Sequence, residues 1–496
     1  MKLGKSLLLG SAAAFASAFG AQAADLPVRK AAPVDYVRVC DFTGAGFFYI
    51  PGTDTCMQLS GLVRTEYAFI NQARAFFPQT LTGTGVSATG QGGQTGIAVI
   101  PAGTVIPGRS RDASGFFARG RLNVDTRTQT AYGTLRAYVR LQIDRLQGNY
   151  QGGGPQGGVN SFANQAGNSP SLDKGFIQFA GITAGRVQSF FDFYADNYNY
   201  EGIANSDESN NVFAYTYTAS GGFSATIAVE DRTGRNLPQN VGNITGGVNA
   251  VTSNAVYAGQ TIPDVVGALN VEQAWGKAQL SAAYHQDSTV TGALGGNLQA
   301  FQTKTQDGFA VQGGVQLKLP MLAAGDDLWI EGAYQEGAYL YQDSGTYLNG
   351  GFNSLFAGGF QHIDRDVIAI GIPGGQGAYT LQKGEGFSVM AAINHYFTPN
   401  FHDVLFGSYE QTSYGRAKNI DWTLGGLGDG SEYRVGNQFL FDPVKNLEIG
   451  LEVIYGHIDQ TLAHNPGQAA TSIAGLRGVS KNPDAFEARL RVERDF

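Results

Sequence analysis

Seven arginines recur at alternate positions in four stretches of the chain, and this spacing indicates a shared electrostatic role. In "TLRAYVRLQID", residues 134–144, one alternate set is apolar and the other contains two arginines. A period of two is typical of a β-strand that places its two sets of side chains on opposite faces. Arginines grouped on one face could attract anions and bias which ions approach. The seven are Arg64, Arg119, Arg121, Arg136, Arg140, Arg489 and Arg491.

An acidic segment rich in aromatic residues offers the opposite charge. Residues 189–211 read "SFFDFYADNYNYEGIANSDESNN" and contain no Lys or Arg. A surface loop would rarely hold six aromatic residues so close together. We therefore expect this segment to fold inward, packing its rings while its carboxylates face the arginines across a narrow gap. The expected acidic group comprises Asp192, Asp196, Glu201, Asp207 and Glu208.

No set of side chains predicts an enzyme. The six histidines have no convincing nucleophile and carboxylate set, and the glycine-rich segments carry no phosphate-binding Walker lysine. Neither cysteine shows a metal-binding pattern, and a net charge of −8 does not favour a nucleic-acid partner. We expect no catalytic residue, cofactor or metal ion. The histidines are His285, His362, His395, His402, His457 and His464.

Sixteen amphipathic stretches must position these charges. Charged residues make up only 15% of the chain, and no apolar run approaches the roughly 20 residues of a membrane helix, which excludes a helical membrane protein. A membrane β-barrel hides its hydrophobicity in alternation and is not excluded. The stretches are 57–69, 115–126, 131–144, 173–180, 182–188, 211–219, 222–230, 267–275, 277–286, 307–319, 327–337, 386–397, 400–411, 431–442, 445–457 and 484–496.

The spacers between these stretches alternate between short turns and long Gly-, Asn- and Ser-rich loops. An even number of strands with short turns at one end and long loops at the other is typical of an outer-membrane barrel, whereas a soluble sandwich would lack that asymmetry. The last stretch alternates up to Phe496, as outer-membrane assembly signals do, although Arg494 departs from that pattern.

The N-terminus predicts export. "MKLGK" is basic, an apolar run follows, and "AQA" at 21–23 fits a cleavage site. We expect a signal peptide at 1–23, a periplasmic segment at 24–56 and a barrel at 57–496. An oxidising compartment favours a disulfide between Cys40 and Cys56, the alternative being two buried thiols.

Barrel closure would place the last strand beside the first, so the arginines would form one patch near mid-height. Facing lipid, each would cost about 2–4 kcal/mol, so we expect them to face the lumen and the acidic segment to be an inward-folded third loop. Two alternatives stay open. The arginines could serve only as cross-strand ion pairs, for example with Glu66 or Asp125. The loop carboxylates could be surface groups.

The mature chain resembles the trimeric general-diffusion porins of alphaproteobacteria. The resemblance lies in "ADLPVRKAAPVDYVRVC", "FFYIPGTDTCMQLSGLVRTEY", "FARGRLNVDTRTQTAYGTLRAYVRLQID", "KGFIQFAGITAGRVQSFFDF" and "RLRVERDF". It implies a 16-stranded all-β barrel in the bacterial outer membrane, a homotrimer embedded in lipid, and passive diffusion of small hydrophilic solutes and ions. It also implies that the two cysteines are joined. The alternative function is a substrate-specific channel of the same architecture.

Overall fold

The structure is a computed structural model, and it describes most of the chain. Residues 1–37 and parts of the long loops lie outside the described residues, and the expected signal peptide at 1–23 falls within that undescribed part. The described ranges are 38–40, 43–71, 75–77, 81–86, 95–100, 104–106, 113–148, 150, 167–237, 253–257, 259, 261–293, 302–345, 365–371, 379–415, 429–460 and 484–496.

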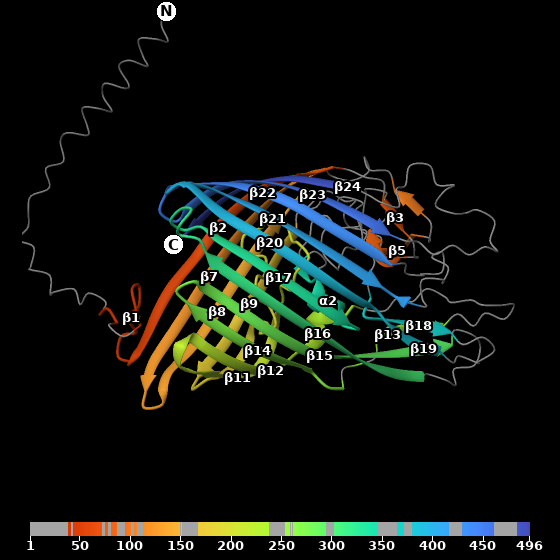
Figure 1. The fold of residues 1–496 in the computed structure, drawn as a ribbon, viewed down its shortest axis with the longest axis horizontal. Coiled ribbons are helices and arrows are strands. Elements are labelled where there is room, and N and C mark those ends of the chain that lie inside the picture. The colour runs from red at the N-terminus through yellow and green to blue at the C-terminus, as the bar shows by residue number, and fades with distance from the viewer. Residues whose placement is uncertain are drawn as a thin grey trace, which may run out of the picture.

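Sixteen antiparallel strands close into a barrel (Figure 1), which confirms the predicted fold class. Closure comes from pairing of the first barrel strand with the last, in the register Leu62 opposite Asp495. The barrel strands are β2 (Thr55–Ile70), β7 (Ser114–Thr130), β8 (Gly133–Leu146), β9 (Gly167–Phe179), β10 (Ile182–Gln188), β11 (Ser209–Thr218), β12 (Phe223–Glu230), β14 (Asp264–Gln273), β15 (Gly276–Ala293), β16 (Gln302–Lys318), β17 (Asp327–Glu336), β20 (Glu385–Thr398), β21 (Phe401–Ser413), β22 (Gly430–Val444), β23 (Leu447–Gln460) and β24 (Asp484–Asp495).

Each predicted stretch coincides with one strand, and the differences lie at the ends. The expected strand at 277–286 continues to Ala293, because β15 goes on pairing with β16 beyond the amphipathic pattern. Cross-strand hydrogen bonding can extend a strand where side-chain alternation no longer reports it.

Shorter elements decorate the barrel. Among the described residues, two further strands join the barrel sheet, six strands pair into three separate two-stranded sheets, and three helical segments are single turns. No helix that the structure describes is both long enough and apolar enough to cross a membrane. These elements are β1 (Phe48–Tyr49), β13 (Ser253–Tyr257), β3 (Ala75–Phe77), β4 (Leu81–Val86), β5 (Thr95–Ile100), β6 (Thr104–Ile106), β18 (Val367–Gly371), β19 (Tyr379–Lys383), η5 (Ser220–Gly222), η6 (Arg232–Arg235) and α2 (Tyr339–Gln342).

The two faces of the wall have the polarity expected of a barrel in lipid. Large apolar side chains point outward along every strand, as Leu135, Val139 and Leu141 do on β8. Charged side chains such as Glu230 and Glu452 are buried inside. A water-soluble protein would have the reverse arrangement, so the apolar set of "TLRAYVRLQID" faces outward.

One end of the barrel carries tight turns. Between β9 and β10, Ala180 and Gly181 both have positive φ, the geometry of the two-residue turn that matches strand twist. A Cβ on Gly181 would lie 2.8 Å from the carbonyl oxygen of Thr216, so glycine is required there. We call this the short-turn end and the opposite end the long-loop end.

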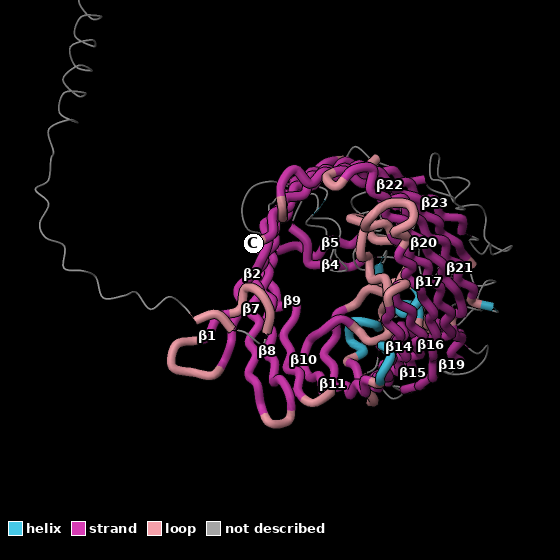
Figure 2. The backbone as a smooth tube through the Cα atoms, turned by 60° about the vertical axis from the view of Figure 1, so that its left-hand side comes forward, coloured by secondary structure: helices cyan, strands magenta, loops and turns pink. Residues whose placement is uncertain are grey.

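The third long loop, Ser189–Glu208 between β10 and β11, folds into the barrel. Figure 2 shows loop and helical segments inside the ring of strands. The rings of this loop pack on other inward-facing rings: that of Phe191 lies 4.8 Å from the ring of Tyr341 in α2, and that of Tyr194 lies 5.5 Å from the ring of Trp329 on β17. The inward-folded third loop is confirmed.

The N-terminal cysteines are joined. Cys40 and Cys56 form a disulfide with a Cα–Cα distance of 6.2 Å, and both are buried together with Phe47. The bridge ties the segment before β2 to the first residues of that strand.

Candidate functional site

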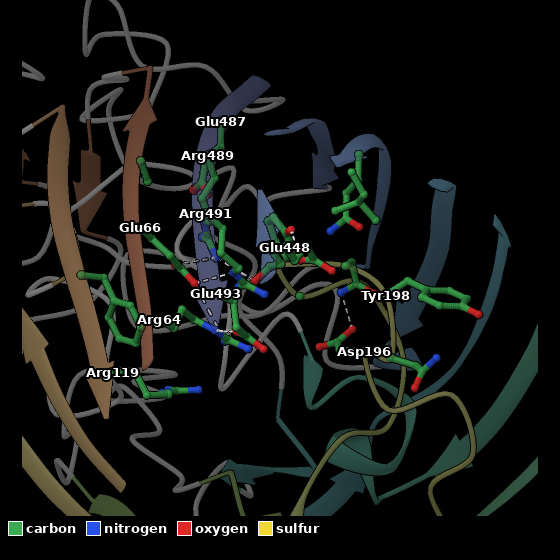
Figure 3. A pocket seen from close by; sticks show the side chains of 18 of the residues that line it. Arg64, Glu66, Arg119, Asp196, Tyr198, Glu448, Glu487, Arg489, Arg491 and Glu493 are labelled. Carbon is green, nitrogen blue, oxygen red and sulfur yellow. Dashed lines mark hydrogen bonds and ion pairs between the residues drawn. The ribbon is translucent and has the colours of Figure 1, made fainter. Parts of the chain in front are cut away.

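A cavity of about 980 Å³ lies between the wall formed by β24, β2 and β7 and the third loop (Figure 3). On the wall side it is lined by Arg64, Arg119, Arg489 and Arg491. The loop contributes Asp196, Tyr198, Tyr200 and Asp207, among others. The cavity therefore has the arginines on one side, interleaved with the carboxylates of Glu66, Asp144, Glu487 and Glu493, and the acidic loop on the other.

Strand register explains why the wall arginines share a face. In the β2–β7 pair, Arg64 lies directly opposite Arg119, and in the β2–β24 pair Arg491 lies opposite Glu66. Because directly opposed residues in an antiparallel pair point to the same side, these side chains all enter the lumen. Pairing of the first strand with the last brings residues more than 400 positions apart into one patch.

Each cavity arginine also has an acidic partner on the wall. Arg119 donates two hydrogen bonds to Asp144, at 2.8 and 2.9 Å, and Arg491 donates to Glu66 at 2.7 Å. Arg64 forms an ion pair with Glu493. The side chains of Arg64 and Arg119 still keep 17% and 20% of their surface exposed. The same arginines therefore form cross-strand ion pairs and line the lumen.

Three of the predicted wall arginines do not line this cavity. Arg121 bonds to Gln142, Arg136 bonds to Asp125 at 2.9 Å, and Arg140 lies 3.4 Å from Asp173. Arg136 is only three positions after Gly133, the first residue of β8. It therefore lies near the short-turn end and not at mid-height.

The five predicted loop carboxylates have different surroundings. Glu201 is fully buried and accepts a 2.5 Å bond from Arg489. Asp192 accepts a 2.7 Å bond from Arg235, with both side chains fully buried, and its other oxygen accepts the backbone N–H of Glu208 at 2.8 Å. Asp196 and Asp207 are the two of the five that line the cavity.

Burial weakens the acidity of both cavity carboxyls. Burial, and then the charge of Asp207, raises the pKa of Asp196 well above its usual range. Burial, and then the charge of Asp192, raises the pKa of Asp207 to about 6. A carboxyl with a pKa of about 6 is mostly ionised at neutral pH, so Asp207 presents a negative charge to the cavity.

Backbone hydrogen bonds fix the loop to two parts of the wall, one of them beside the arginine-bearing strand β24. Glu452 on β23 accepts the N–H groups of Tyr200 and Glu201 at 2.6 and 2.9 Å. Glu331 on β17 accepts the N–H of Tyr194 at 2.8 Å. Hydrogen bonds to charged acceptors are among the stronger ones in proteins, so the loop has a defined position in the lumen.

Sequence reasoning missed the groups that hold the loop. Arg434, which donates to the carbonyl oxygen of Gly202 at 2.6 Å, and Glu452 fall on the polar set of predicted strands, so the period-two pattern could have identified both as lumen-facing. Arg235 lies in a single helical turn after β12, where no periodicity marks an inward direction. The sequence gives one indication of its role: this basic residue follows β12, which pairs with β11, the strand that begins directly after the acidic loop.

Comparison with known proteins shows that the chain is similar to porins. The family model described as "Porin subfamily" matches residues 25–475. The chain is 30% identical over 348 residues to the protein named Porin Omp2b of Brucella suis biovar 1 (strain 1330). The aligned region covers 69% of this chain and 77% of the relative. Porin Omp2b of Brucella melitensis biotype 1 matches with the same identity and coverage.

A solved structure shares the fold. The outer membrane channel DcaP of Acinetobacter baumannii aligns with a TM-score of 0.51 over 90% of this chain and 99% of that chain. At 13% sequence identity this likeness concerns the barrel architecture alone.

Proposed function

Because this chain belongs to the porin subfamily and is an outer-membrane diffusion channel, we propose that small hydrophilic solutes and ions cross it passively, between the arginine-bearing wall and the third loop. The cavity in Figure 3 is the proposed constriction. Its proposed basic wall consists of Arg64, Arg119, Arg489 and Arg491.

The observation that carries this proposal is that all four arginines of the cavity lie on one wall, opposite the third loop. Arginines from three adjacent strands face a loop that presents Asp196 and Asp207. Fixed charges of opposite sign on two sides of a narrow lumen produce a transverse field, which orients dipolar solutes and biases ion passage. Arg121, Arg136 and Arg140 would extend the basic surface along the same side of the lumen.

A substrate-specific channel is the alternative, and the aromatic residues of the cavity test it. A sugar channel would present open ring faces along the lumen. Here the guanidinium of Arg491 lies 3.5 Å from the ring centre of Tyr200, and that of Arg489 lies 5.6 Å from Tyr150. The hydroxyls of these tyrosines bond to Glu448 and Glu66. Rings occupied in this way favour a general pore.

Two further parts of the proposal, the division of the chain and the oligomeric state, rest on the family and on sequence pattern. Residues 1–23 act as a signal peptide, residues 24–56 form a periplasmic segment and residues 57–496 form the barrel. The functional unit in the membrane is a homotrimer. N-terminal sequencing of the mature protein and light scattering of the detergent-solubilised protein test these two assignments.

Diffusion through the barrel is tested by reconstituting the full mature protein in planar bilayers and liposomes. We expect stepwise conductance, and sugar influx that rises linearly with concentration and falls smoothly with solute size. Folded protein that gives no conductance steps would overturn the channel. Saturable influx of one sugar class, with exclusion of others of equal size, would instead support the substrate-specific alternative.

A further inference from the structure

A second cluster of buried ionisable groups lies at the long-loop end of the barrel, outside the lining of the cavity. Asp264 begins β14, and His285 and Asp287 lie on the inward face of β15. Asp366 reaches the same place from the segment just before β18. His285, Asp264 and Asp366 have no exposed surface, and Asp287 is 5% exposed.

The imidazole of His285 is held in one orientation. Its Nδ1 lies 2.8 and 2.9 Å from Oδ2 and Oδ1 of Asp264, and Oδ2 also accepts a hydrogen bond from the hydroxyl of Tyr341 at 2.7 Å. Nε2 is thereby directed toward Asp287, whose Oδ1 lies 3.6 Å away. Among the described residues, neither Nε2 nor Oδ2 of Asp287 has a hydrogen-bond partner. Buried polar atoms are rarely left without a partner, so these two adjacent unsatisfied atoms need an explanation.

Asp366 completes the cluster and is itself positioned by backbone. Its carboxylate accepts the N–H of Tyr339 at 2.6 Å and the N–H of Leu237 at 3.0 Å. Ligand atoms of His285, Asp287 and Asp366 all lie within 4.8 Å of one another. Two ligands of a tetrahedral zinc ion, at about 2.1 Å from the metal, are about 3.4 Å apart, so small side-chain rotations would close the site.

The charge of the cluster favours a cation. Three carboxylates surround one imidazole, and in the described part of the chain no Lys or Arg forms an ion pair with any of the three. A protonated imidazole would still leave two negative charges away from water, which is costly. A divalent ion bound by Nε2 and two carboxylates would offset that charge and satisfy both unpartnered atoms.

We propose that His285, Asp287 and Asp366 bind one divalent transition-metal ion such as Zn²⁺, and that Asp264 orients the imidazole. Mixed nitrogen and carboxylate ligation suits this class better than Mg²⁺ or Ca²⁺, which take oxygen ligands. A carboxylate on the second ring nitrogen is the usual support of a metal-bound histidine. The ion links the wall strand β15 to the segments that carry Asp366 and Leu237, and so holds these segments in place at the long-loop end.

The test uses folded, untagged full-length mature protein stripped of metal with a chelator. Titration with Zn²⁺ should give one ion per chain, and Co²⁺ should give the intense visible absorption of a low-symmetry site. Asp287→Asn and Asp366→Asn, which keep the shape of each side chain, should weaken Zn²⁺ binding by at least about 100-fold. Asp264→Asn should weaken it by about 10- to 100-fold, as loss of an orienting group does.

The matched control is His457→Gln. His457 also pairs with an aspartate, Asp484, at 2.7 Å, but that carboxylate is 60% exposed. This variant should bind Zn²⁺ as the native chain does. Native protein that binds less than one ion per chain overturns the site, as does binding that survives both asparagine substitutions. If a variant fails to fold, X-ray absorption of the Zn²⁺-loaded native protein decides: one imidazole with oxygen ligands supports the site, and any other ligand set refutes it. None of these measurements depends on conductance, so the site and the channel can fail independently.

Discussion

Replacing Arg119 with glutamine should shift the channel toward cations. Arg119 lines the cavity, and its side chain is 20% exposed. Glutamine can still hydrogen-bond to Asp144, so the wall should keep its shape while it loses one positive charge. The partner carboxylate, held at 2.8 Å in the native wall, then adds an uncompensated negative charge to the lumen.

The size of the shift follows from Coulomb's law. A unit charge acts on an ion passing at about 5 Å with about 0.8 kcal/mol in water. Screening in 0.1 M salt, with a Debye length of about 10 Å, reduces this to about 0.5 kcal/mol. That energy changes the local concentration of each ion about 2-fold, in opposite directions for the two signs. The ratio of cation to anion permeability should therefore rise about 5-fold.

Reversal potentials in planar bilayers under a salt gradient measure this ratio. Arg494→Gln is the matched control, because it removes the same charge from an exposed side chain that bonds only to the backbone carbonyls of Lys445 and Asn446. We expect no measurable shift from it. An unchanged reversal potential in Arg119→Gln, or equal shifts in the two variants, would refute the assignment of the wall.

Three other perturbations test the hydrogen bonds that hold the third loop, the charge of Asp207 and the N-terminal disulfide. Glu452→Gln leaves one acceptor oxygen for two loop N–H groups and should cost about 1.5–3 kcal/mol of the free energy that holds the loop in place. We expect noisier single-channel currents from this variant. Glu272→Gln, which changes an exposed side chain, should give currents like those of the native protein. Because the pKa of Asp207 is raised to about 6, its carboxyl gains charge as pH rises from 5 to 7, so cation preference should rise over that window; a rise that persists in Asp207→Asn would contradict this. Cys40→Ser with Cys56→Ser removes a crosslink worth about 3 kcal/mol, so chymotrypsin should cut near Phe47 faster while the barrel stays intact; equal cutting rates would count against it.

The barrel could be predicted because membrane strands must satisfy a strict rule. Every side chain faces either lipid or the lumen, so alternation persists through each strand, as in the residues from Leu135 to Ile143. The wall arginines followed from the same rule combined with closure, which places β24 beside β2. Height along the barrel was less secure, as Arg136 shows, because it depends on exact register and turn position.

The interior of the barrel was harder to predict, because loops carry no periodicity. The inward fold of the third loop could be inferred from its aromatic residues, but the partners of its carboxylates could not. Asp192 pairs with Arg235 from a different loop, and Glu201 pairs with Arg489 from the far end of the chain. Such pairs depend on where an irregular segment comes to lie in space, which alternation does not report.

If solutes pass between the arginine wall and the third loop, a charge attached to that loop must change both conductance and ion selectivity. Asn197 lies on that loop, is exposed and lines the cavity. Both native cysteines are in the disulfide, so Asn197→Cys would introduce one reactive thiol. Attaching a positively charged thiol reagent there should lower single-channel conductance and shift the reversal potential toward anions, and a negatively charged reagent should shift it toward cations. Conductance and selectivity that stay unchanged after complete labelling with both reagents would contradict the claim.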